Sequence, residues 1–193
     1  MKNQDLKLKK QFSEAWNYIK ESKNYIYVTI FLFTISIILG FIFSEKLSFF
    51  KEIIKEILKQ TEGLNTIEMI FFIMQNNIQS SLLTIILGIA FGIFPLISII
   101  LNGTLIGYVL SITSQINGPT TWLLLLPHGI FEIPAILISM GLGIKLGAPL
   151  FTNKKPLQEF KRRIYQTANV FIMIIIPTLI LAAIIEGILI AVF

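Results

Sequence analysis

Residues 122–146 read WLLLLPHGIFEIPAILISMGLGIKL, an apolar run in which only His128, Glu132 and Lys145 can carry a charge. At about 1.5 Å of rise per residue, a helix of this length is longer than the ~30 Å hydrocarbon core of a bilayer. The other residues are uncharged and mostly apolar, so they can lie in lipid. The stretch therefore predicts a helix that crosses a membrane.

The composition of the whole chain agrees with this interpretation. The 193 residues are 54% hydrophobic and only 14% charged, and the mean hydropathy is +0.78. Too few charged residues remain to cover a soluble domain, which excludes a secreted globule, a disordered tail and a nucleic-acid binder. The net charge of +5 indicates how the chain is oriented in the membrane, because basic residues that flank apolar segments are the usual topology signal. The absence of cysteine excludes disulfides, thiolate metal sites and thiol nucleophiles.

Five apolar segments predict an all-α fold, a polytopic transmembrane bundle with some short or broken helices. Pro95 interrupts the second segment, Asn102-Gly103 ends it, and the third segment is short for a full crossing. Residues 25–193 are expected to form one transmembrane domain. Its predicted spans are residues 25–43, 82–101, 104–116, 122–146 and 170–193.

Two further stretches have the pattern of amphipathic helices. Residues 1–24 place apolar side chains on one helical face and lysines around the rest, which predicts a helix on the membrane surface. Residues 45–60 alternate charge and apolarity at helical spacing, which predicts a second helix at the interface or over the bundle. The apolar face of the first stretch consists of Leu8, Phe12, Ala15, Trp16 and Ile19.

The distribution of Lys and Arg predicts the topology. Six precede Tyr25, four lie in residues 44–62, none lies in residues 102–121, and six lie in residues 145–163. The first and last groups are therefore expected on the cytoplasmic side. An even number of crossings must separate them, so five spans result, with the N-terminus cytoplasmic and the C-terminus outside. A four-span alternative needs the third segment to be re-entrant, and it leaves the last basic group outside.

Small residues recur at four-residue spacing in three successive segments. Such stripes let helix backbones approach closely in lipid, where close packing drives association. They predict one compact bundle, and they leave open whether a stripe contacts this chain or a second copy. The stripes are Thr84-Gly88-Gly92, Gly103-Gly107-Ser111 and Ala135-Ser139-Gly143-Gly147.

Ionisable residues inside the spans form the candidate site. Pro127 suits the first turn of a helix, which would place His128 and Glu132 one turn apart on one face. Glu186 is expected to join them, to meet an asparagine or to be protonated. The predicted pocket comprises His128, Glu132, Glu186, Asn102, Asn76 and Asn77.

Three interpretations of this pocket remain open. A catalytic or metal site is weakly supported, because metalloprotease spacing needs two histidines and the chain has one. A transport site would relay protons or bind a cation at broken helices. A purely structural, hydrogen-bonded trio would fix the register of the helices. No catalytic residue, metal or cofactor is predicted.

The run from Pro127 to Ala135, PHGIFEIPA, resembles the stage II sporulation protein M family, as do Asn76-Asn77, Asn102-Gly103 and Glu186-Gly187. The resemblance extends from about Asn76 to the C-terminus. In spore formers it implies a membrane scaffold that holds cell-wall hydrolases at the division septum during engulfment. Relatives occur in organisms that never sporulate, and others lie beside circular-bacteriocin genes, which implies a role in secretion. The resemblance implies no catalytic mechanism.

The sequence thus predicts a multi-pass protein of the cytoplasmic membrane that acts as a non-enzymatic scaffold or assembly partner. The alternative is a small transporter or export accessory that uses the His128/Glu132/Glu186 pocket. An intramembrane hydrolase is the least favoured reading. The expected partners are the lipid bilayer, other membrane proteins and a second copy of the chain, but no nucleic acid.

Overall fold

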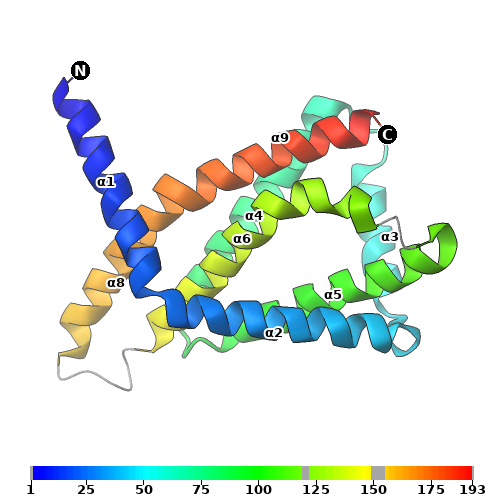
Figure 1. Ribbon diagram of the computed structural model, residues 1–193, viewed down its shortest axis with the longest axis horizontal. Helices are drawn as coiled ribbons and strands as arrows, with labels where there is room; N and C mark the ends of the chain where they lie inside the picture. The colour runs from blue at the N-terminus through cyan, green and yellow to red at the C-terminus, as the bar shows by residue number, and fades with distance from the viewer. Residues whose placement is uncertain (1, 119–121, 149–154, 193) are drawn as a thin grey trace.

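The computed structural model describes residues 2–118, 122–148 and 155–192 (Figure 1). Within these ranges it is helical and contains no strand, which confirms the predicted all-α fold. Five of the described helical segments are long and apolar enough to cross a membrane, as a multi-pass membrane protein requires. The elements are α1 (Lys2–Glu21), α2 (Lys23–Ile42), η1 (Ser44–Leu47), α3 (Phe50–Thr61), α4 (Thr66–Gly88), α5 (Ile93–Asn117), α6 (Trp122–Gly147), α8 (Pro156–Val170), η3 (Phe171–Ile175) and α9 (Ile176–Val192).

The second span differs from the predicted residues 82–101, because it is helix α4 and begins much earlier. A capping box starts α4: the Asn65 side chain accepts hydrogen bonds from the backbone N–H groups of Ile67 and Glu68, at 3.0 and 3.1 Å. The Glu68 carboxylate in turn accepts from the Asn65 backbone N–H at 2.9 Å. This start satisfies the free N–H groups of the first turn. The helix that starts here includes Asn76 and Asn77 and ends at Gly88.

The third span differs as well, since α5 covers Ile93–Asn117 rather than residues 104–116. The chain breaks at Phe91 and Gly92, whose φ angles of 59° and 70° are left-handed. Pro95 lies in the first turn of α5, where its missing N–H removes no helical hydrogen bond. The predicted break at Asn102-Gly103 is wrong. Both residues lie inside α5, and Gly103 is needed there for contact with α2.

Helices α2 and α5 lie side by side and run in the same direction (Figure 1). A Cβ atom on Gly107 would overlap the backbone oxygen of Ile37, and one on Gly40 would overlap that of Thr104. The pairing continues to Ser44 and Ser111, whose hydroxyls are hydrogen bonded at 2.8 Å. The predicted Gly103-Gly107-Ser111 stripe thus meets a matching stripe, Ser36-Gly40-Ser44, that the sequence analysis did not identify.

Helices α4 and α6 also run in the same direction and touch backbone to backbone. A Cβ atom on Gly88 would overlap the backbone of Gly143, and one on Gly147 would overlap Gly92. Such contacts leave no room for a side chain, so glycine is required at these crossings. The glycines of the first and third predicted stripes therefore contact one another within this chain. Helix α9 packs against both helices.

The helices form two arms that meet at one end and diverge toward the other (Figure 1). One arm is α2 with α5, and the other is α4, α6 and α9. The arms meet where Gly141 contacts Ile26 and where the Thr29 hydroxyl donates to the Leu137 carbonyl oxygen at 3.2 Å. Helices α1 and α8 project from this end, and α3 joins the arms at the other (Figure 1). The meeting end carries most of the buried core.

Candidate functional site

The predicted His128–Glu132 contact lies outside the described residues, because the side chain of His128 is not described. Helix α6 does hold both residues, one turn apart along its backbone. Pro127 does not occupy the first turn, however, since α6 begins at Trp122. The apolar residues before Pro127 are part of the same helix. The motif therefore lies within a continuous helix rather than at its positive end, and Pro127 leaves the Leu123 carbonyl without its helical donor.

The packing register predicts that Asn77 and Glu132 lie at the same level. Each stands eleven residues, or three helical turns, before a glycine of the α4/α6 crossing, namely Gly88 and Gly143. Residues three turns apart lie on the same face of a helix, so both positions belong to the faces on which α4 and α6 approach each other. Asn77 is buried and Glu132 is half-buried. A contact between the two side chains stays a prediction.

The other predicted pocket residues are more dispersed. Glu186 is half-buried on α9, next to Gly187, which contacts the Ile70 side chain of α4. Asn76 is exposed. Asn102 is exposed too, and its side-chain amide donates to the Ser98 carbonyl of its own helix at 2.8 Å. These two asparagines are therefore not directed into a buried polar cluster.

A second polar cluster, which the sequence analysis missed, lies where the two arms meet. The Lys145 side chain is only 4% exposed, and its ammonium group donates to Glu21 Oε1 and to Ser22 Oγ, each at 2.9 Å. The same ammonium lies 3.9 Å from the centre of the Tyr18 ring, in cation–π contact. A lysine from the last turn of α6 thus holds the junction between α1 and α2.

Two arginines of α8 complete this cluster. Arg162 binds both carboxylate oxygens of Glu21, at 2.7 and 3.0 Å, and also binds Glu159. The buried Arg163 donates to Glu159 and to the Lys145 carbonyl oxygen, each at 2.6 Å. We call the set Glu21, Lys145, Glu159, Arg162 and Arg163 the ion cluster. It joins α1, α6 and α8, and each charge has an opposite charge beside it.

The surroundings fix the protonation states at the α1 side of the cluster. Hydrogen bonds from Arg162 and from Lys145 lower the pKa of Glu21 to about 2, against the opposing effect of burial. Burial raises the pKa of the Tyr18 hydroxyl to about 12. At neutral pH, Glu21 is therefore ionised and Tyr18 is neutral.

One signal in the sequence pointed to the cluster. Lys145 is an ionisable residue within an apolar helix, which by default needs a partner. The distribution of basic residues groups Lys145 with the basic loop, and Glu21 is too distant in sequence to be paired with it by spacing. Neither cluster contains a cysteine, and among the described residues no three His, Cys, Asp or Glu side chains could hold a metal ion.

The apolar helices, their glycine crossings and the partly buried ion cluster define a polytopic α-helical membrane protein. The family model described as stage II sporulation protein M matches residues 29–189, and the chain belongs to this family, as the resemblance predicted. A protein of Methanocaldococcus jannaschii described as uncharacterized is 35% identical over 124 residues, which covers 63% of this chain and 67% of that protein. No solved structure matches the chain.

Proposed function

We propose that the protein is a non-enzymatic scaffold or assembly partner of a complex in the cytoplasmic membrane or cell envelope. The ion cluster carries this proposal. Its five charged side chains bind one another across α1, α6 and α8, so they fix the relative positions of these helices. The two buried cations of the cluster, Lys145 and Arg163, each have a carboxylate partner, as a structural role requires. The arrangement is that of a rigid platform.

Two amphipathic helices offer surfaces on which partners can dock. Helix α1 exposes Phe12 and Trp16, and α3 exposes Ile57 and Leu58. Large aromatic and aliphatic side chains of this kind dominate the binding energy of protein interfaces. The ion cluster holds α1 at a fixed angle to the bundle, which lowers the entropic cost of binding there. These exposed faces support an assembly role.

Photo-crosslinking in native membranes tests the scaffold proposal. A photoreactive residue is placed at Trp16, at Ile57 and, as a lipid-facing control, at Ile38 of α2, which are 48%, 44% and 50% exposed. We expect adducts of a defined protein mass from Trp16 or Ile57 and none from Ile38. Lipid adducts alone at all three positions would contradict a docking role for either helix.

The proposed orientation places α1 in the cytoplasm and α3 outside. Its structural support is that the leader and the basic segment that begins at Lys145 meet at one end of the bundle through Glu21. Because the chain has no cysteine, single cysteines at the exposed Asn17 and Gln60 report on one side each. In intact cells, an impermeant maleimide should label Q60C and not N17C. The reverse pattern would invert the topology.

A transport role is the second candidate, because Glu132 and Glu186 are half-buried in the spans and Asn77 lies level with Glu132. Intramembrane acids of this kind mark ion pathways by default. Proteoliposomes with an internal pH dye test this role. A proton flux that Glu132→Gln abolishes and that Glu62→Gln, an exposed control, preserves would favour transport. Absence of flux in wild-type proteoliposomes would remove this candidate.

A further inference from the structure

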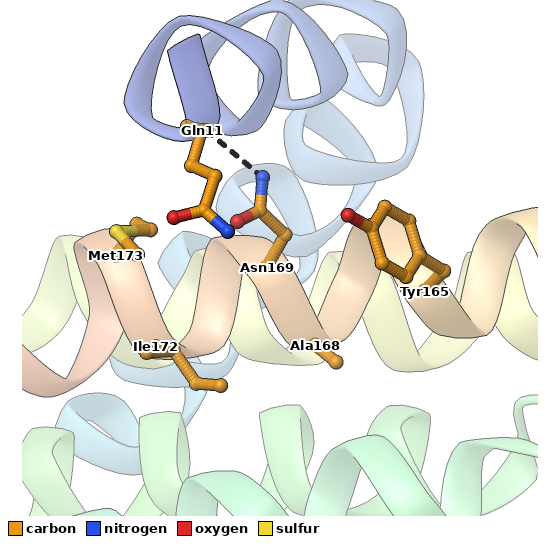
Figure 2. A pocket seen from close by; sticks show the side chains of 6 residues that line it. All are labelled: Gln11, Tyr165, Ala168, Asn169, Ile172 and Met173. Atoms are coloured by element: carbon orange, nitrogen blue, oxygen red, sulfur yellow. Dashed lines mark hydrogen bonds between the residues drawn. The ribbon is translucent and has the colours of Figure 1, made fainter. Parts of the chain in front are cut away.

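A pocket of about 160 Å³ lies between α1 and the continuous helix formed by α8, η3 and α9 (Figure 2). The carboxamides of Gln11 and Asn169 lie in it, with the Tyr165 ring on one side and Met173 on the other (Figure 2). Asn169 is only 8% exposed, and its side-chain nitrogen donates to the Gln11 backbone oxygen at 2.9 Å. The pocket therefore has a polar centre.

The pocket lies at the boundary between polar and apolar sequence. Residues 155–163 carry one acidic and four basic side chains, whereas from Val170 onward the next ionisable residue is Glu186. This transition places Asn169 at the level of the headgroups and Ile172 at the start of the hydrocarbon region. A ligand here would have its polar part among the amides and its apolar part along α9.

The local helix geometry also marks this site. Ile172 and Met173 belong to η3, a π-helical turn at Phe171–Ile175. Turns of this type are rare and occur frequently at functional sites. The Ile172 side chain is 57% exposed, so an apolar chain can lie against it.

An exposed lysine on the same helix face indicates the charge of the ligand. Lys161, Tyr165, Ala168 and Ile172 recur at helical spacing, so Lys161 extends the pocket-lining face by one turn toward the polar end. Lys161 is exposed, and no ion pair is recorded for it among the described residues, whereas its neighbours Arg162 and Arg163 are committed to Glu159. This face thus runs from a cation through a tyrosine to aliphatic side chains, and Asn169 lines the pocket beside it.

We propose that this pocket binds one anionic phospholipid, with its phosphate near Lys161 and Tyr165 and an acyl chain along Ile172. A lysine ammonium and a tyrosine hydroxyl are suitable donors to a phosphate, and bonds to a charged acceptor are the stronger ones. The Asn169 and Gln11 amides face the glycerol and ester region. Occupancy would bridge α1 to the last span, independently of whether the protein is a scaffold.

Lipid titration of the full-length protein in mild detergent tests the proposal. The probes are short-chain phosphatidylglycerol, short-chain phosphatidylcholine and glycerol phosphate, and the readouts are native mass spectrometry and the melting temperature. We expect one saturable phosphatidylglycerol per chain, with a rise in melting temperature. The variants Lys161→Gln and Tyr165→Ala should each weaken that binding at least about fivefold. Lys155→Gln, an exposed lysine just before α8, is the matched control and should leave it unchanged.

Four results would overturn the proposal. The first is the absence of a saturable phosphatidylglycerol site, and the second is equal affinity for phosphatidylcholine. The third is an equal loss in Lys155→Gln, which would show nonspecific attraction to the basic segment. The fourth is tight binding of glycerol phosphate alone, which would define a soluble-anion site rather than a lipid site.

Discussion

Helix α6 has a buried half and an exposed half, and each contains ionisable residues. In the half after Pro134, Leu142 is 0% exposed and Lys145 is held by the ion cluster. In the described part before Ala135, every residue is at least partly exposed, and Ile130 reaches 60%. The buried half meets α4, α5 and α2, whereas the other half lies where the arms have diverged (Figure 1).

This difference separates the part of α6 that maintains the fold from the part that contains the family motif. Burial and backbone contact make the half after Ala135 intolerant of change, because close-packed helices cannot absorb extra atoms. The motif around His128 and Glu132 lies where packing is looser. Substitutions there should alter activity or assembly more than stability.

The largest expected effect comes from a methyl group in the buried half. Gly143→Ala places a Cβ atom 2.8 Å from the Pro95 side chain and 2.9 Å from the Thr84 carbonyl oxygen. We expect a loss of about 1–3 kcal/mol in unfolding free energy, since the backbone must move. Thermal unfolding in detergent measures it. The matched control is Gly129→Ala in the exposed half, where the Ile133 side chain is the one described neighbour within 4 Å. Equal losses in the two variants would remove the contrast.

The ion cluster should give the next largest effect. Lys145→Met keeps the length of the buried stem but removes the contacts to Glu21 and Ser22. Glu21 keeps Arg162, so we expect a loss of about 1–2 kcal/mol rather than the cost of an isolated buried charge. Lys155→Met, at an exposed position, should stay within about 0.5 kcal/mol of wild type. If Lys145→Met leaves the stability unchanged, apolar packing alone fixes α1.

The pH dependence of stability tests the same cluster with a smaller expected effect. Because the pKa of Glu21 is lowered from 4.5 to about 2, its stabilising effect is complete above about pH 5 and is lost as the pH falls toward 2. Glu21 is 45% exposed, so the effect is modest, about 1 kcal/mol or less. The melting temperatures of wild type and Glu21→Gln should differ at pH 6 and converge as the pH falls. A constant difference down to pH 3 would contradict this linkage.

Sequence patterns predicted the fold class and the number of spans, because hydropathy and basic clusters report on them directly. They misplaced the second and third spans, because Asn76-Asn77 interrupts the hydropathy of α4 and Asn102-Gly103 has the composition of a turn. The capping box at Asn65 and Glu68 was readable, and it would have moved the boundary. Gly103 also shows that a glycine in a span can mark a helix contact as readily as a break.

The candidate site was less predictable than the fold. Periodicity placed His128 and Glu132 one turn apart, and the glycine crossing later placed Asn77 level with Glu132. The crossing register depends on tertiary packing, which spacing within one helix does not reveal. The contact between Lys145 and Glu21 joins residues that are 124 positions apart in the sequence. The two residues meet only because the tertiary fold packs α1 against α8 and the end of α6.

The smallest expected effect lies in the exposed half of α6. Glu132→Gln keeps the shape and a hydrogen-bonding oxygen of the half-buried side chain while it removes a carboxyl group whose charged form is expensive in lipid. The melting temperature should therefore equal or slightly exceed that of wild type. Asn102→Ala, which removes only a hydrogen bond to its own helix, is the baseline for a change of about 0.5 kcal/mol or less. If the Glu132→Gln variant folds but loses its crosslinked partner or its proton flux, the motif has a functional role. If the variant unfolds, Glu132 is structural, and both halves of α6 then serve to maintain the fold.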